Sequence, residues 1–331
     1  MFNKKLPLFF IFLMLVPASV SAVEYTDSLR VQGGINHVQG IAYDKSGDCF
    51  FCSFTTAFYK VASDGRVLGG IEDIHGHLGA LTFDERTRKV YASLECKDDE
   101  IGRGISKGMG KAAYTRDESR FYIAEIDVDN MTMTTHELPE VRKDYLAGNY
   151  ACSGIDGVSM APHFGHRKGK ARFLYVAYGI YGDTTRTDND CNILLCYRPG
   201  KFSRPVHKYF IPTGNTTYGV QNLCYDSHSG KMFMAVYRGR KSSYPNYSIF
   251  ALDMDQKPES GIPAGIPYQK DKVLMLESFS GWHQNLGSTG ICSMGDGFFY
   301  VGVNGREDGR QVCDFKLYQH TASPQTPFKR P

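Results

Sequence analysis

The chain has 331 residues, of which 42% are hydrophobic, and its 38 Lys and Arg against 35 Asp and Glu give a formal net charge of +3. This balance excludes an intrinsically disordered chain, which has fewer apolar residues and more uncompensated charge. It also gives no electrostatic reason to expect a nucleic-acid partner, because such proteins carry a strong or clustered basic excess.

The first 22 residues are typical of a secretory signal peptide. Lys4 and Lys5 precede an apolar run over 6–16, and the small residues Ser21 and Ala22 offer a cleavage site. The apolar run is shorter than the roughly 20 residues that span a membrane. We therefore expect a secreted or periplasmic protein that is cut near Ala22, with one domain over 23–331 and no transmembrane span.

The chain has nine cysteines, an odd number, so at least one lacks an intramolecular partner. Cys49 and Cys52 fall in one strand-like apolar run, where an offset of three places them on opposite faces. This arrangement argues against a two-ligand metal motif. We expect most of the cysteines to be packed as small hydrophobic residues.

Five segments share a pattern in which a small residue and then an aliphatic residue begin a short strand. Internal similarity of this kind indicates a repeat architecture. The small residues are Gly40, Ala80, Gly157, Asn222 and Gly290, and the aliphatic ones are Ile41, Leu81, Val158, Leu223 and Ile291.

Each of these segments is followed by a turn and a second strand that begins with an aromatic residue. The second strands are predicted at 51–55, 91–95, 175–179, 233–237 and 300–304. Third strands fit 57–62, 120–128, 192–197, 248–253 and 311–320, and fourth strands fit 67–71, 133–138, 207–211 and 272–277. The fifth repeat has no fourth strand of its own, but residues 29–33 can supply it.

An all-β fold of repeated four-stranded antiparallel units predicts a five-bladed β-propeller, closed by the N-terminal strand. The alternative, a β-sandwich, predicts neither the repeated unit nor the displaced strand. The blades are placed at 37–73, 77–139, 154–212, 219–278 and 287–320 plus 29–33. The chain resembles the broad superfamily of secreted β-propellers over essentially its whole mature length. The resemblance is architectural and carries over no family's catalytic motif.

The register of a blade brings the starts of first strands and the ends of second strands to one face around the axis. This axial mouth gathers His37 and His77 with Glu95 and Asp156, the predicted metal ligands. Glu95, Asp156 and His77 are also the candidate catalytic residues. The predicted substrate-binding residues are Gln39, Gln221, Arg238, Tyr237, Asn304, Trp282, His283 and Tyr218.

The mouth has several interpretations. Imidazole and carboxylate ligands suit a divalent metal such as calcium or zinc, although the sequence does not identify the cofactor. Glu95 or Asp156 can instead act as acid or base with a histidine on a sugar or ester. The mouth can also be a polar funnel without chemistry. A histidine that begins an inner strand often only bonds the neighbouring blade.

Two insertions face the same mouth. Residues 97–119 of the second repeat form either a lid or a solvated excursion. In the third repeat, Asp183, Asp188 and Asp190 form either an oxygen cluster suited to calcium or a polar turn. The turns after the first strands, which begin with Asp44, Asp84 and Asp226, face the opposite way and are given a structural role.

The favoured hypothesis is an exported hydrolase-like propeller whose axial site, metal-dependent in one interpretation, acts on a small ester, lactone or carbohydrate. The alternative is a non-catalytic extracellular module that binds a glycan or protein at the same mouth. A purely structural propeller is a third option. The expected partner is a small molecule or glycan rather than nucleic acid, and the oligomeric state is left open.

Overall fold

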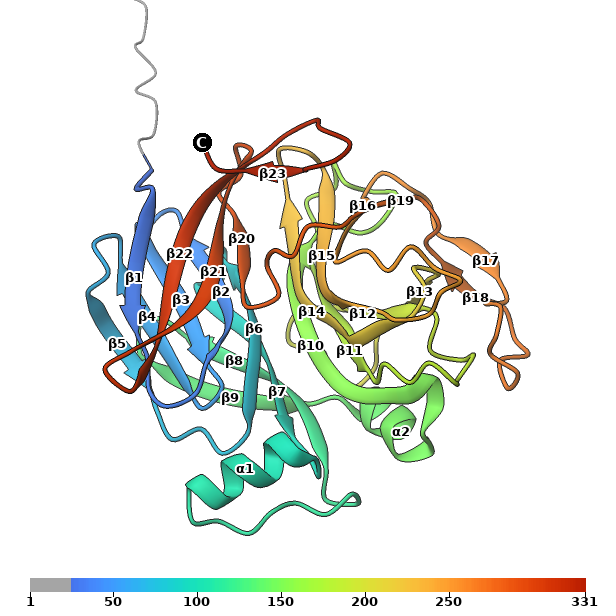
Figure 1. Ribbon diagram of the computed structural model, residues 1–331, viewed down its shortest axis with the longest axis horizontal. Coiled ribbons are helices and arrows are strands. Elements are labelled where there is room, and N and C mark those ends of the chain that lie inside the picture. The colour runs from blue at the N-terminus through green and yellow to red at the C-terminus, as the bar shows by residue number, and fades with distance from the viewer. Residues whose placement is uncertain (1–24) are drawn as a thin grey trace, which may run out of the picture.

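The computed structural model of the chain describes residues 25–331 (Figure 1). The predicted signal peptide at 1–22 lies outside the described residues. Within 25–331, no helix has the length and apolar character needed to cross a membrane.

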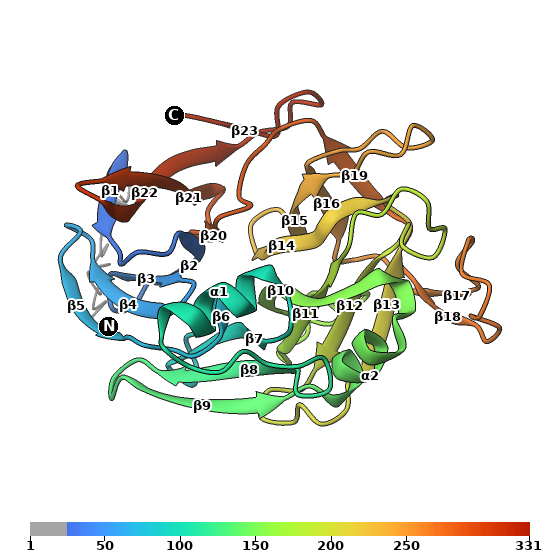
Figure 2. The same ribbon diagram turned by 60° about the horizontal axis from the view of Figure 1, so that its bottom comes forward.

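Five antiparallel sheets, each built on four strands, form a five-bladed β-propeller, as the sequence predicts (Figure 2). Blade one consists of β2 (Val38–Asp44), β3 (Cys49–Phe54), β4 (Ala57–Ala62) and β5 (Val67–Ile71). Blade two consists of β6 (His77–Asp84), β7 (Lys89–Cys96), β8 (Arg120–Asp127) and β9 (Thr132–Glu137). Blade three consists of β10 (Cys152–Ala161), β11 (Phe173–Ile180), β12 (Asn192–Tyr197) and β13 (His207–Ile211).

The last two blades differ in how their outer strands are supplied. Blade four consists of β14 (Thr216–Asp226), β15 (Lys231–Arg238), β16 (Ile249–Asp253) and β19 (Phe279–Trp282). Blade five consists of β20 (Ile291–Ser293), β21 (Phe298–Glu307), β22 (Arg310–His320) and β1 (Ser28–Gln32). β1 pairs antiparallel with β22, which confirms the predicted closure by the N-terminal strand. A short strand, β23 (Phe328–Lys329), also pairs with β22.

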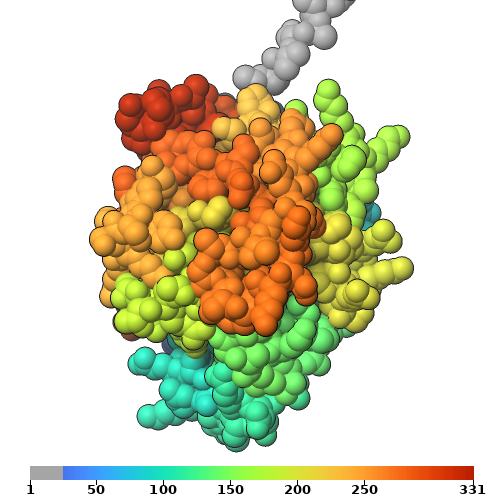
Figure 3. Space-filling model, turned by 90° about the vertical axis from the view of Figure 1, so that its right-hand side faces the viewer, coloured from blue at the N-terminus to red at the C-terminus, as the bar shows by residue number. Residues whose placement is uncertain are grey.

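The predicted fourth strand of blade four at 272–277 is wrong. β18 (Val273–Met275) in this segment pairs in parallel with β13 of blade three and antiparallel with β17 (Glu259–Gly261). The outer strand of blade four is instead β19, which pairs with β16. The apolar run Val273–Met275 has the composition of a strand in either place, so the pattern alone does not reveal its partner. In the space-filling view, this orange segment lies on the outside of the molecule (Figure 3).

The small column of the repeat lies where the first strands converge around the axis. A Cβ on Gly40 would lie 2.7 Å from the Ala80 Cα, and one on Gly157 would lie 3.1 Å from the Asn222 backbone carbon. Small residues are therefore needed for neighbouring blades to approach. The side chain of Asn222 connects the backbone of separate segments near the axis. Its Nδ2 donates to the Gln39 carbonyl at 3.0 Å and to the Ser288 carbonyl at 3.1 Å.

The second strands are buried on both faces, because each lies between two neighbouring blades. Every residue of β3 is buried, and its Phe50 ring contacts Phe315 of blade five at a centroid distance of 5.2 Å. All nine cysteines are free and buried, as expected for packed hydrophobic residues.

Three helical segments interrupt the strands. α1 (Glu100–Gly108) lies inside the predicted insertion 97–119, where the Asp99 side chain accepts a hydrogen bond from Gly102 N at 2.7 Å and caps its first turn. α2 (Pro139–Ala147) and the 3₁₀ turn η1 (Asn149–Ala151) connect blades two and three. The sequence pattern does not predict α2, whose short amphipathic signal is weak.

Candidate active site at the axial mouth

His77 and Glu95 face each other across two strands of blade two. His77 begins β6 and Glu95 lies near the end of β7, and the register pairs the two residues directly. Side chains of directly paired residues point to the same face of a sheet. His77 Nδ1 accordingly lies 3.6 Å from Glu95 Oε2, with the two side chains 11% and 2% exposed.

Asp156 joins this pair from blade three. Its carboxylate, one nitrogen of His77 and one oxygen of Glu95 all lie within 4.8 Å of one another. The register of β10 shifts twice near Asp156. One shift lies between Cys152 and Gly154, and the other lies between Ile155 and Val158 and includes Asp156. Such irregularities re-aim side chains next to functional sites.

Gly154 makes room for the Glu95 carboxylate. It has a φ of +131°, and a Cβ at this position would overlap Glu95 Oε1. The next residue, Ile155, donates its backbone N–H to the same Oε1 at 2.7 Å. The backbone of blade three therefore holds a carboxylate that belongs to blade two.

Lys97 is the residue of this site that the sequence reasoning missed. Its Nζ lies 2.7 Å from Glu95 Oε2 and 3.3 Å from Asp99 Oδ2, and it donates to the Ser153 carbonyl at 2.8 Å. The sequence pattern places Lys97 at the start of the insertion 97–119 and gives it no role in the site. The spacing of two residues from Glu95, which places both on one side of an extended chain, was the available signal.

The two carboxyl groups have opposite pKa shifts. Burial raises the pKa of Asp156 well above its usual range, and the neighbouring Glu95 charge raises it further. Burial also opposes ionisation of Glu95, but Lys97 and then His77 outweigh it and lower the pKa of Glu95. Of the two carboxyl groups, Glu95 is therefore the one that ionises more readily and Asp156 the one that holds its proton more strongly.

His77 keeps one ring nitrogen unused. Its Nε2 is buried and has no hydrogen-bond partner among the described residues, while Nδ1 faces Glu95. A carboxylate beside Nδ1 favours the tautomer that leaves Nε2 free to accept a proton. Glu95 and His77 therefore have the arrangement of an oriented general base.

His37 does not join the cluster. It lies exposed at the rim, and Gln39 Nε2 donates to its Nε2 at 2.9 Å. Local desolvation and the nearby His77 lower the pKa of His37. Three of the four predicted ligands therefore come together, and His37 stays apart with its ring nitrogen bonded within blade one.

Several predicted substrate-binding residues do lie beside the cluster. Gln221 Nε2 donates to Asp156 Oδ2 at 3.2 Å and to the Tyr218 carbonyl at 3.1 Å. Tyr218, Tyr237 and Arg238 line one cavity of about 870 Å³ on blade four. Burial raises the pKa of Tyr237, and the Asp156 carboxylate raises it further.

Asn304, Trp282 and His283 make contacts within the propeller. Asn304 Oδ1 accepts a hydrogen bond from Val38 N at 3.2 Å, so this side chain joins blades one and five. Trp282 ends β19, the outermost strand of blade four, and His283 lies against the Tyr247 ring at a centroid distance of 4.9 Å. The sequence pattern places Trp282 and His283 in an axial loop because it places the fourth strand of blade four at 272–277, before its actual position in β19.

The two predicted insertions, residues 97–119 and the segment of Asp183, Asp188 and Asp190, differ in their contacts. α1 lies beside the start of blade two, where His75 Nε2 is 3.1 Å from Ser106 Oγ and Tyr114 OH is 3.0 Å from His75 Nδ1. The three aspartates of the other insertion have separate partners: Thr185 for Asp183, Arg186 for Asp188, and Lys241 for Asp190. They therefore form a polar turn and not a calcium site.

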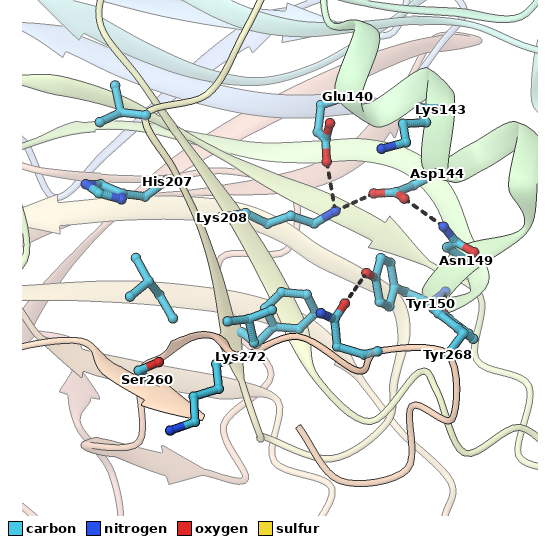
Figure 4. A pocket seen from close by; sticks show the side chains of 15 residues that line it. Glu140, Lys143, Asp144, Asn149, Tyr150, His207, Lys208, Ser260, Tyr268 and Lys272 are labelled. Carbon is cyan, nitrogen blue, oxygen red and sulfur yellow. Dashed lines mark hydrogen bonds and ion pairs between the residues drawn. The ribbon is translucent and has the colours of Figure 1, made fainter. Parts of the chain in front are cut away.

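A second lysine in an ion pair, the half-buried Lys208, lines a cavity of about 540 Å³ outside blade three (Figure 4). Lys208 pairs with Asp144 and, at 3.2 Å, with Glu140, both on α2. Asp144 also accepts hydrogen bonds from Tyr178 OH at 2.8 Å and Asn149 Nδ2 at 2.9 Å. The carboxylate of Asp144 is fully satisfied, so this cluster fastens α2 to the propeller.

The axial trio offers nitrogen and oxygen donors of the kinds that bind divalent metals, and the unused His77 Nε2 is compatible with a ligand. Lys97 argues against this use. Its ammonium already lies 2.7 Å from Glu95 Oε2, so a metal ion would have to compete with a fixed positive charge. The residues therefore fit a proton-transfer site better than a metal centre.

Comparisons with known proteins give no family. No family model matches the chain, and no curated protein matches it. Among solved structures, the Dos1 propeller is 8% identical with a TM-score of 0.38, over 80% of this chain and 52% of that one. This chain thus spans about half of that protein's length.

A second solved structure, of a provisionally assigned gluconolactonase, is 12% identical with a TM-score of 0.36, over 87% of this chain and 92% of that one. At these values neither likeness bears on the activity of this chain. The propeller assignment rests on the strand order and pairing of the chain itself.

Proposed function

We propose that this propeller is a hydrolase of small esters or lactones, with Asp156 as the proton donor and His77 as the base. The observation that carries the proposal is the axial cluster itself. Two carboxyl groups and an imidazole lie within 4.8 Å, and Lys97 pairs with only one of the carboxyls. Paired titratable groups in unlike environments are typical of acid–base sites.

The reaction follows from the proton positions. His77 Nε2 takes a proton from a water molecule while the water oxygen attacks the carbonyl carbon. Asp156 gives its proton to the leaving oxygen as the carbon–oxygen bond breaks, which yields an acid and an alcohol, or a hydroxy acid from a lactone. The proton on His77 then returns to Asp156 through water. Glu95 stabilises the imidazolium that forms between these steps.

The surroundings suit a small polar substrate. Tyr218 and Tyr237 present exposed rings to a cavity of about 870 Å³ on blade four, and Arg238 brings a positive charge to this cavity. Gln221, which bonds Asp156, is placed to orient its proton. Lys97 is enclosed by its own partners and serves to keep Glu95 ionised.

The test is turnover by purified residues 23–331 on short-chain aryl esters, aliphatic lactones and aryl glycosides, with and without a chelator. We expect ester or lactone hydrolysis that survives chelation. Asp156→Asn and His77→Gln should each lower kcat by about 100-fold or more. The matched surface variants Asp255→Asn and His228→Gln should retain it.

Failure takes distinct forms. Loss of activity on chelation would favour the metal interpretation of the same residues. Saturable binding of a glycan without turnover of any substrate would favour the non-catalytic alternative. Activity that persists in Asp156→Asn would overturn the role given to this carboxyl.

We also propose export of the chain, on the composition of residues 1–22. N-terminal sequencing of protein from fractionated cells should find the mature chain beginning near Val23, outside the cytoplasm. Protein that begins at Met1 in the cytoplasm would contradict this.

A further inference from the structure

The opposite end of the propeller axis holds a second cavity, of about 500 Å³. It is lined by turns and strand ends of all five blades. A narrower cavity of about 130 Å³ continues from it between the first strands of the blades. The two share Tyr43, Phe83, Met160, Tyr225 and Ser293 as lining, so the wider cavity is the outer part of one axial opening.

Two acidic residues of this end, Asp44 and Asp226, are turned inward. Asp44 is fully buried and accepts hydrogen bonds from the backbone of Ser46 and Gly47, both at 3.0 Å, and from Arg88. Asp226 is also fully buried and accepts from Ser293 Oγ at 2.6 Å. These carboxylates are used as turn caps, which agrees with the structural role that the sequence gives to the turns.

The basic residues of this end are not neutralised in the same way. Lys45, Lys170 and Arg172 line the cavity, and none of them has a carboxylate within 4.0 Å among residues 25–331. Arg172 bonds only the carbonyls of Gly169 and Ala171, at 2.9 and 3.2 Å. The remaining charges of the lining are Arg86, which pairs with Asp84, and Glu85.

These cations come from separate parts of the fold. Lys45 follows the first strand of blade one, whereas Lys170 and Arg172 belong to the β10–β11 loop of blade three. That loop, residues 162–172, also carries Arg167 and Lys168. The overall charge of the chain is nearly balanced, so the excess of the cations Lys45, Arg86, Lys170 and Arg172 over the acids Asp84 and Glu85 in this lining is local.

Between the cations lies an aromatic floor. Tyr43, Phe83 and Tyr225 are each half-buried and line both the outer and the inner cavity. Positively charged groups around aromatic faces suit a ligand that joins an anionic group to a flat apolar body.

We propose that this opening binds a small organic anion, in which a carboxylate, phosphate or sulfate meets Lys45 and Arg172 and a flat apolar part rests on the aromatic floor. The site is independent of the proposed hydrolytic mouth at the other end of the axis. Because charged hydrogen bonds to an anion are stronger than neutral ones, the two cations contribute most of the affinity.

The test is calorimetric titration of residues 23–331 with phenylphosphonate, which is not an ester, at low ionic strength. We expect saturable binding of one equivalent that weakens as salt is added. Inorganic phosphate, which lacks the flat body, should bind at least about tenfold more weakly. The double variant Lys45→Met with Arg172→Met should raise Kd at least about tenfold.

Two control variants locate the effect. Lys168→Met removes a charge from the same loop but not from the lining, and Arg238→Met removes the cation of the other mouth. Both should bind phenylphosphonate like the unmodified chain, with unchanged melting temperatures. Absence of saturable binding would overturn the proposal. So would equal weakening by Lys168→Met, which would indicate diffuse attraction, or a dependence on Arg238. Equal affinity for inorganic phosphate would overturn the role of the floor.

Discussion

Two lysines of the protein pair with carboxylates in different parts of the fold, the buried Lys97 and the half-buried Lys208, and their surroundings differ. Around Lys208, the carboxylate of Asp144 has a cation, a phenol and an amide as partners. Around Lys97, the ion pair with Glu95 is accompanied by Asp156, whose pKa is raised chiefly by burial, and by an unpartnered His77 nitrogen. Saturated polar networks hold structure together, whereas groups left in costly states mark a site for chemistry.

The largest expected effect is on the axial pair. Lys97→Met leaves the buried Glu95 charge without its cation and should lower the free energy of unfolding by about 3–5 kcal/mol, measured by urea denaturation. The double variant Glu95→Gln with Lys97→Met removes the stranded charge and should recover at least half of this loss. Equal stability of Lys97→Met and the unmodified chain would show that the pair is not coupled.

The same change in the other region should affect stability alone. Lys208→Met strands Asp144 and should lower the free energy of unfolding by about 2–3 kcal/mol, less than at Lys97, because hydrogen bonds to Asp144 remain. Its kcat on any ester or lactone that the protein hydrolyses should be unchanged at a temperature where the variant is folded. A loss of kcat comparable to that of His77→Gln would erase the distinction between the two regions.

Gly154→Ala tests the support of Glu95 by blade three. The substitution combines a φ of +131° with overlap of the Glu95 carboxylate. It should destabilise the chain by about 2 kcal/mol in thermal or urea unfolding. Gly104→Ala is the matched control, because a Cβ there meets nothing within 4 Å. Tolerance of both changes would mean that Gly154 is not required.

The smallest expected effect has the opposite sign. The folded-state pKa of Asp156 lies above its unfolded value, so the fold loses stability as the pH rises from about 3.9 through the raised pKa. Asp156→Asn removes this loss and should raise the melting temperature at pH 7. The gain should disappear below about pH 4. A variant that is less stable than the unmodified chain at pH 7 would contradict the assignment.

The sequence predicted the five blades because each blade repeats the same steric demand at the axis. Gly40 and Gly157 recur where a Cβ would meet the neighbouring strand, so the pattern follows directly from the geometry. The segment 272–277 was misplaced because strand composition indicates burial and not the identity of the partner strand. Trp282 was misplaced for the same reason.

At the site, the sequence allowed the prediction that His77, Glu95 and Asp156 share one mouth, because strand register determines which strand ends lie on the same face. Lys97 was missed because a charged residue after a strand is read as the start of a loop. His37 lies outside the trio and its ring accepts a hydrogen bond from the Gln39 side chain, a contact that no spacing rule predicts.

The central claim is that Asp156 holds its proton more strongly than an ordinary aspartate, beside a Glu95 that ionises more readily than an ordinary glutamate. Carbon-13 NMR titration of the carboxyl groups, with Asp156→Asn and Glu95→Gln used for assignment, measures this directly. We predict that Asp156 titrates above the ordinary aspartate value of about 3.9, and Glu95 below the ordinary glutamate value of about 4.3. An Asp156 that titrates at or below the ordinary aspartate value would contradict the account.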